Sequence, residues 1–223
     1  MLWVFGDSFS ISREQLRDKP EFMIWPEIVS HNLNLENYYN YAEWGVSNEY
    51  IYHQYHIHSA EIKPGDYIVI QLTSIDRQWF FKDIPTKGNY YSKGIQEGLS
   101  KEQYEAIKMY ITYLQRDELD IQRYHLLHLA LERLKHIMNY SRILILPGFT
   151  PIPNCKGTLV NVSEDEFVSK NNMQKYYDNN NGIDPRSNHL SKNNHKILAS
   201  KITRYFTHGT PIDLTTDFEK SFI

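Results

Sequence analysis

Short apolar runs alternate along this chain with longer segments of helical period, and this alternation constrains the fold most strongly. Strands are expected at 2–8, 37–45, 66–74 and 142–149. Helices are expected at 20–33, 47–62, 101–140 and 189–206. Strands that are almost continuously apolar and alternate with helices are typical of a parallel sheet covered on both faces.

The sequence predicts an interruption in one of these helices and a buried face on another. Pro26 is expected to interrupt the helix at 20–33, because proline breaks a helix interior. Leu127, Leu131, Leu134 and Met138 share one face of the helix at 101–140, which should face the core.

The chain has 223 residues, which suits a single domain over 1–223. Residues 75–100 have no clear period and are expected to form a long loop, so a lid or insertion is expected around 75–120. The Asn-rich stretch at 171–194 is expected to be a loop within the domain.

Net charge, apolar runs and cysteine content indicate which classes of binding partner and which cellular location to expect. The net charge of −3 does not suggest nucleic acid or an anionic membrane as the main partner. No run approaches the roughly 18 apolar residues of a membrane helix, and no signal peptide is recognisable in the chain as given. A cytoplasmic or virion-associated protein is therefore expected. Cys155 is the single cysteine, so no internal disulfide is possible, and we interpret it as incidental.

The first strand runs directly into Gly6-Asp7-Ser8. Ligands of parallel sheets bind at the carboxyl ends of the strands, and Ser8 follows such an end. A serine hydroxyl becomes a nucleophile when a base takes its proton, so Ser8 is a candidate nucleophile. The alternative is that Ser8 caps a helix.

Candidate partners for Ser8 lie around the start of the last helix, where Asp184, His189 and His195 occur. A histidine would be the base and a carboxylate would orient its ring. His195 is expected to pack or to face solvent, because it lies well inside the helix. Asp184 is equally well interpreted as a turn former, because it precedes a proline.

These segments together resemble the SGNH (GDSL-type) hydrolase superfamily of esterases and lipases. Its first block is matched by Gly6-Asp7-Ser8, its second by Gly45 in NYAEWGVSN, and its last by His189-Leu190-Ser191 with the later His195. The blocks span nearly the whole chain in the order of the family. The resemblance implies a flavodoxin-like three-layer α/β/α sandwich with a central parallel sheet.

The resemblance also implies roles. Ser8 would attack an ester carbonyl, His189 would serve as base and then as acid, and Asp184 would orient His189. The amides of Ser8 and Gly45 would hold the oxyanion. Asp7 is expected to be structural, bonding its own loop. The expected substrate is a small O-acyl ester, such as an acetyl group on a glycan, with no cofactor.

The chain departs from the family pattern at two places. In QLTSIDR (71–77), Ile75 stands where the family has the Asn that binds the oxyanion, while Asp76 matches the family's Asp. Thr73, Ser74 and Asn48 are the candidates to replace that donor. Arg186 stands where the family has its acid, and Asp184 lies two residues earlier. The alternative to an esterase is therefore a catalytically weak or inactive module that binds a glycan or serves in a virion.

The remaining residues that suggest a ligand site are interpreted as follows. His53, His56 and His58 suggest a metal site, but a solvated helix face is favoured and no metal is expected. Trp79, Phe80 and Phe81 are expected either in the core or lining a substrate site. A nucleotide-binding domain is disfavoured, because no Gly-rich phosphate loop follows the first strand.

Overall fold

Four parallel strands form the central sheet of the computed structural model, in the spatial order β2-β1-β3-β4. The strands are β1 (Leu2–Phe5), β2 (Tyr38–Asn40), β3 (Tyr67–Leu72) and β4 (Ile143–Pro147). The order of strands reverses between β1 and β3, which is the topological switch point of a flavodoxin-like sheet. The structure describes residues 1–16, 21–75, 77–79, 100–138, 142–153, 155–163 and 189–219.

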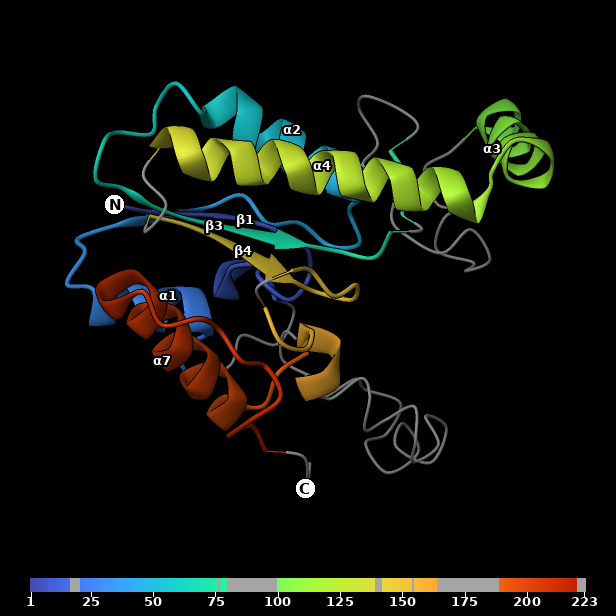
Figure 1. The fold of residues 1–223 in the computed structure, drawn as a ribbon. Coiled ribbons are helices and arrows are strands. Elements are labelled where there is room, and N and C mark those ends of the chain that lie inside the picture. Colours follow the sequence, from blue (N-terminus) through green and yellow to red (C-terminus); the bar gives the residue numbers. More distant parts are fainter. Residues whose placement is uncertain are drawn as a thin grey trace, which may run out of the picture.

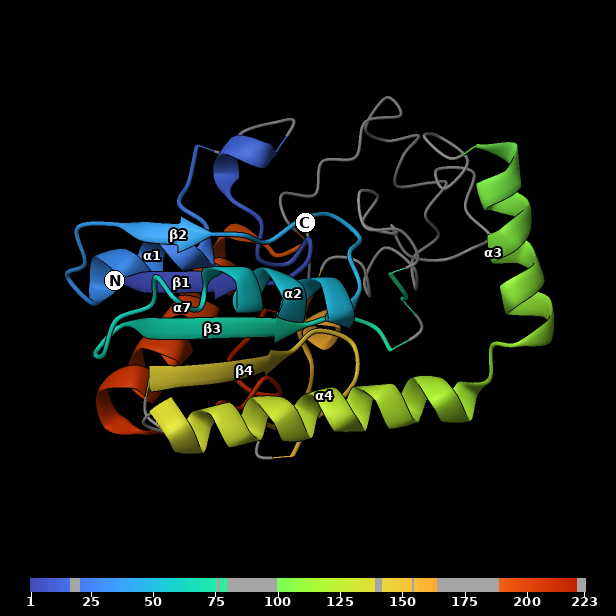
Figure 2. The same cartoon turned by 90° about the horizontal axis from the view of Figure 1, so that it is seen from above.

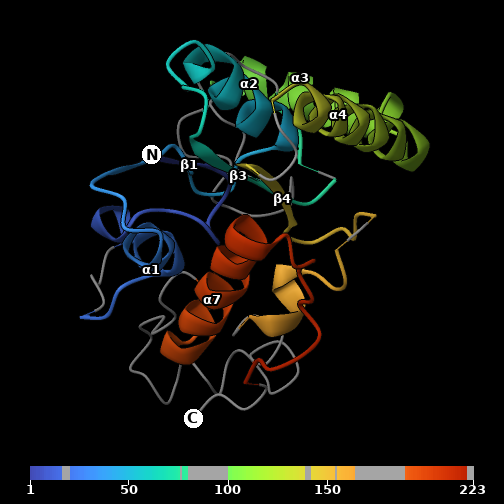
Figure 3. The same cartoon turned by 60° about the vertical axis from the view of Figure 1, so that its left-hand side comes forward.

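Helices cover both faces of this sheet. They are α1 (Trp25–Asn32), α2 (Asn48–His58), α3 (Lys101–Tyr113), α4 (Asp117–Met138) and α7 (Lys192–His208), with 3-10 turns at Arg13–Gln15 and Leu159–Val162. Helices α1 and α7 lie against one face, and α2 and α4 against the other (Figures 1 and 3). The predicted three-layer α/β/α architecture is confirmed. Helix α3 stands beyond the end of the sheet (Figure 2).

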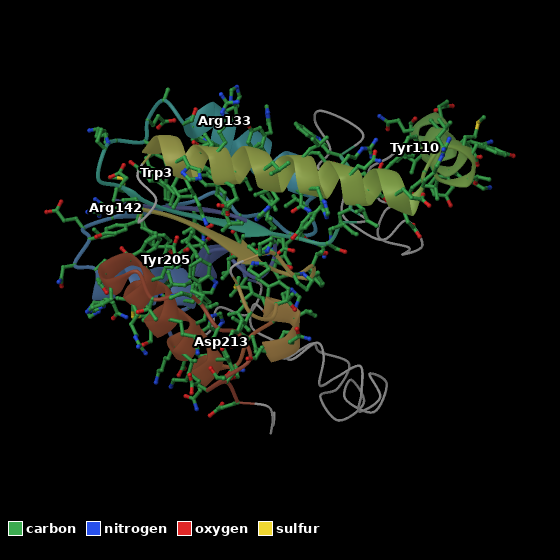
Figure 4. All side chains as sticks on the ribbon, viewed as in Figure 1. Trp3, Tyr110, Arg133, Arg142, Tyr205 and Asp213 are labelled. Carbon is green, nitrogen blue, oxygen red and sulfur yellow. The ribbon has the colours of Figure 1, made fainter. Side chains whose placement is uncertain are left out.

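Side chains of each strand alternate between the two layers, as the pleat of a strand requires. In β1, Leu2 and Val4 pack into the α1–α7 layer, whereas Trp3 and Phe5 pack into the α2–α4 layer. In Figure 4, the labelled Trp3 lies in the α2–α4 layer, and the labelled Tyr205 of α7 lies in the opposite layer. Both faces are therefore apolar, which explains why the strands read as continuous apolar runs.

Two predicted helices differ from the observed ones. Helix α1 begins at Trp25, and Pro26 lies in its first turn rather than interrupting it. Proline suits that position because the first turn leaves its amide groups without intrahelical partners. The segment at 101–140 forms α3 and α4, separated at Leu114, whose amide closes α3 on Tyr110.

The predicted inner face of α4 is confirmed where its side chains are described. Leu131 is fully buried, and Leu127 and Leu134 pack beside it against the sheet. Residues 76 and 80–99 lie outside the described residues, so the lid predicted around 75–120 stays a prediction there. No described helix combines the length and apolarity that crossing a membrane requires.

Candidate active site

The residues that follow β1 form a tight turn at the carboxyl end of the sheet. The amide of Ser10 donates to the carbonyl of Asp7 at 2.9 Å, so Ser8 lies inside this turn and is buried. Gly6 is required by a close approach, because a Cβ there would lie 2.8 Å from Oε1 of Gln71. Ser8 caps no helix, since the helical turn that follows is capped by Ser12.

Gln71, on the neighbouring strand β3, anchors this turn. Its Oε1 accepts from the amide of Asp7 at 2.9 Å and from the hydroxyl of Ser10 at 3.0 Å. Its Nε2 donates to the carbonyl of Leu72 at 2.7 Å. Gln71 is completely buried, so these bonds satisfy polar groups that water does not reach.

Asp7 holds the turn from its own side chain. Oδ1 accepts from the amide of Phe9 at 3.1 Å, as the structural role predicted for Asp7 requires. Oδ2 accepts from the hydroxyl of Thr73 at 2.5 Å and from Nη1 of Arg77 at 2.9 Å. The carboxylate therefore ties the end of β1 to the segment after β3, across the switch point.

His189 lies against this turn. Its ring centroid is 4.8 Å from that of Phe9, the residue after Ser8, and both ring nitrogens are shielded from solvent. The backbone of His189 is left-handed, with φ 60°, and Ser191 caps α7 by accepting from the amide of Asn194. His189 itself therefore does not cap the helix, and its unusual backbone turns the chain just before α7 begins.

The segment with Gly45 lies at the same end of the sheet. The Trp44 ring centroid is 6.2 Å from that of His189, and the amide of Glu43 donates to the carbonyl of Gly6 at 3.1 Å. Gly45 has φ 63°, a left-handed conformation that glycine adopts without strain. The segments that carry Ser8, Gly45 and His189 thus meet, although they are far apart in the sequence.

The predicted replacement donors, Thr73, Ser74 and Asn48, also lie here, after β3 and at the start of α2. The amide of Thr73 donates to Oδ1 of Asn48 at 2.8 Å. Nδ2 of Asn48 donates to the carbonyls of Thr73 and Ser74 at 3.3 and 3.4 Å. These bonds, with that from Thr73 to Asp7, already engage the Thr73 hydroxyl and the amide nitrogen of Asn48. Binding an oxyanion with either side chain would require them to break.

The side chain of Ile75 brings no polar group to this arrangement. It packs against the apolar cluster of the α2–α4 layer. It also lines a cavity of about 290 Å³ between α2 and α4. The other residues that line this cavity are Asn48, Glu49, Tyr52, Arg77, Asp120, Arg123, Tyr124, Leu126 and Leu127. Position 75 therefore serves the core and the cavity wall.

Several predicted residues fall outside this arrangement. Asp184, Asp76, Phe80 and Phe81 lie outside the described residues, so the role of Asp184 as the orienting acid stays a prediction. Trp79 packs edge-on against Tyr50 with ring centroids 5.4 Å apart, which agrees with its interpretation as a core residue.

The other histidines have structural contacts. His195 is buried, and its Nδ1 accepts from the amide of Trp25 at 3.2 Å, so the expectation that it packs is confirmed. His58 stacks on Tyr41 and lies 2.8 Å from Glu61 through Nδ1. Within the part of the chain that the structure describes, no group of three or more His, Cys, Asp or Glu residues could hold a metal ion.

The raised pKa of Cys155 agrees with its interpretation as an incidental residue. Burial raises the pKa of its thiol to about 12, and the charge of Asp213 adds to the effect. The reactive form of cysteine is the thiolate, which is scarce at neutral pH when the pKa is so high.

Sequence reasoning missed Gln71, Arg77 and Phe149. Gln71 left one signal, since it is a polar residue within the apolar run YIVIQL.

Comparison of the chain with protein-family models, with curated proteins and with solved structures gave no match. The resemblance to SGNH hydrolases therefore stays an expectation from the three sequence segments.

Proposed function

We propose that this chain is a serine hydrolase of the SGNH type that cleaves a small O-acyl ester, such as an acetyl group on a glycan. One observation carries the proposal: the ring of His189 packs at 4.8 Å on Phe9, directly after the candidate nucleophile Ser8. This contact lies at the switch point of the sheet, where folds of this class bind ligands.

The proposed reaction follows from these roles. His189 takes the proton of the Ser8 hydroxyl as the oxygen attacks the ester carbonyl, which gives a tetrahedral oxyanion. The backbone amides of Ser8 and Gly45 are the proposed donors to that oxyanion. His189 then protonates the leaving alcohol, and water hydrolyses the acyl-serine by the reverse steps. Asp184 is the proposed acid that orients His189.

The cavity beside the site supports a small polar substrate. It has a volume of about 290 Å³ and adjoins the site through Asn48 and Arg77. Its wall combines two tyrosines, Tyr52 and Tyr124, with charged side chains of both signs. Aromatic faces with a few polar groups are typical of small-ligand sites, and they suit a hydroxylated ester.

Labelling with a fluorophosphonate tests the proposal, because this reagent reacts with activated serines. We expect labelling of the wild-type chain on the peptide that contains Ser8, as located by mass spectrometry. Ser8→Ala should abolish it, and His189→Ala should slow it by several orders of magnitude. Ser59→Ala and His31→Ala are matched controls on the surface and should label like the wild type. Circular dichroism should show that each variant is folded.

A second candidate function is a binding module without catalysis. It is favoured by Ile75 in place of an oxyanion donor and by the internal bonds that occupy Thr73 and Asn48. Loss of one such donor typically costs about 100- to 1000-fold in turnover. A folded wild-type chain that shows no labelling of Ser8, and hydrolyses no acetylated sugar, would replace the esterase with this module.

A further inference from the structure

Arg77 is the cation that faces the buried carboxylate beneath the Ser8 turn. The side chain of Asp7 is fully buried and that of Arg77 is 16% exposed, with Nη1 2.9 Å from Oδ2. Among the described residues, the other donors to Asp7 are neutral: the amide of Phe9 and the hydroxyl of Thr73. A buried carboxylate is strongly disfavoured unless a cation and hydrogen bonds compensate it, so Arg77 supplies the charge that the neutral donors lack.

The guanidinium of Arg77 is itself held in place. Nη1 also donates to Oγ1 of Thr73 at 2.6 Å, and Cζ lies 5.0 Å from the ring centroid of Phe149. Phe149 packs edge-on against Phe9 at 5.5 Å, and Phe9 in turn packs against His189. Contacts therefore run from Arg77 through Phe149 and Phe9, the residue after Ser8, to His189.

We infer that Arg77 is a positioning residue for the nucleophile, acting on the Ser8 turn through Asp7. This role rests on the proposed function. Arg77 fixes the carboxylate of Asp7, and that carboxylate fixes the amide of Phe9 on the far side of Ser8. A displacement of about 1 Å in a reacting group can cost about 100-fold in rate, so a turn held on both sides of Ser8 matters for reaction.

The kinetics of fluorophosphonate labelling separate this role from a role in binding the reagent. Arg77→Met should lower the maximal labelling rate of Ser8 by roughly 10- to 100-fold. The apparent dissociation constant of the reagent should change little, because positioning acts on the reaction step. Arg133→Met is the matched control, since Arg133 is exposed on α4 and does not line the cavity.

A second substitution tests whether the effect passes through Asp7. In the Arg77→Met background, Asp7→Asn removes the uncompensated charge but keeps an oxygen for the amide of Phe9. The double variant should label faster than Arg77→Met alone, which a purely local loss of packing would not produce. Arg77→Lys keeps the charge without the fork of the guanidinium and should fall between the wild type and Arg77→Met.

Each outcome decides the inference. If Arg77→Met does not fold, the Lys variant and the double variant carry the test. Labelling of Arg77→Met at the wild-type rate, an equal loss in Arg133→Met, or a double variant no faster than the single one would overturn the role. Those results leave the esterase standing, whereas a wild-type chain without labelling at Ser8 would overturn the esterase and this role together.

Discussion

The turn at Gly6–Ser10 and helix α3 are built in opposite ways. The turn is held by buried hydrogen bonds to Gln71, Thr73 and Arg77, each more than 60 residues away in the sequence. Helix α3 stands beyond the sheet, and its Tyr110 accepts from Nη2 of Arg123 at 3.1 Å (Figure 2). Apolar side chains stay exposed on α3 and the residue after it: Met109, Tyr113 and Leu114 are 61%, 75% and 59% exposed.

This difference predicts which region of the chain should tolerate substitution. A buried polar group costs free energy when its partner is removed, whereas an exposed side chain loses little. Substitutions in the turn should therefore affect stability and labelling together, and substitutions on α3 should affect neither. The following experiments test this contrast.

Removal of the anchor on β3 should have the largest effect. Gln71→Leu keeps the volume but leaves the amide of Asp7 and the hydroxyl of Ser10 buried without their acceptor. We expect the free energy of unfolding to fall by about 4 kcal/mol, since each orphaned group costs about 1–3 kcal/mol. Urea unfolding measures the change. Gln122→Leu on the exposed face of α4 is the control, and an equal change there would contradict the role of Gln71.

A methyl group at Gly148 should have the next largest effect. A Cβ there would lie 2.3 Å from the carbonyl oxygen of Leu72 and 2.6 Å from Nε2 of Gln71. Overpacking of this kind typically costs 1–3 kcal/mol, and contact with backbone places Gly148→Ala at about 3 kcal/mol. Gly209→Ala is the comparison, because a Cβ there meets no atom within 4 Å and φ is 67°. It should cost about 1 kcal/mol, and a larger loss at Gly209 would contradict the steric argument.

Cys155 differs from both regions, because it is half-buried and packs beside the apolar clusters of both layers with Asp213 and Lys135 nearby. Burial raises the pKa of its thiol to about 12, whereas an unfolded thiol has a pKa of about 8.5. The folded state therefore holds the proton more tightly, and this contribution to stability is present below pH 8.5 and declines as the pH rises towards 12.

Two measurements check this expectation. Iodoacetamide at pH 8 should alkylate the folded chain at least about 100-fold more slowly than the urea-unfolded chain. Between pH 8 and pH 10.5, the free energy of unfolding of the wild type should fall more than that of Cys155→Ala. Parallel losses in the two proteins would assign the pH dependence to other groups.

The smallest effects are expected on α3 and just after it. Tyr113→Ala and Leu114→Ala remove exposed side chains, so the free energy of unfolding should change by less than about 0.5 kcal/mol. The rate of Ser8 labelling should stay at the wild-type value. A clear loss of labelling in either variant would show that this region contributes to the site, and the contrast with the turn would fail.

Several features of the fold were predictable because they depend on local pattern. The apolar runs at 2–8, 66–74 and 142–149 contain β1, β3 and β4, because strands covered on both faces leave an unbroken apolar signature. The end of α3 was not predicted, because helical period continues on both sides of Leu114. The first turn of α4 carries Asp117, Glu118 and Asp120, acids that favour a helix start and were the available signal.

The sequence by itself determined the α/β class, the parallel sheet, and the placement of Ser8 and Gly45 just beyond strand ends. These follow from the period of apolar residues and from glycine's backbone freedom, which act over a few residues. Only the tertiary structure decided that His189 packs on Phe9, that Gln71 and Arg77 hold the turn, and that Thr73 and Asn48 bond to each other. Such pairings depend on which side chains the packed layers bring into contact, a condition that no local pattern encodes.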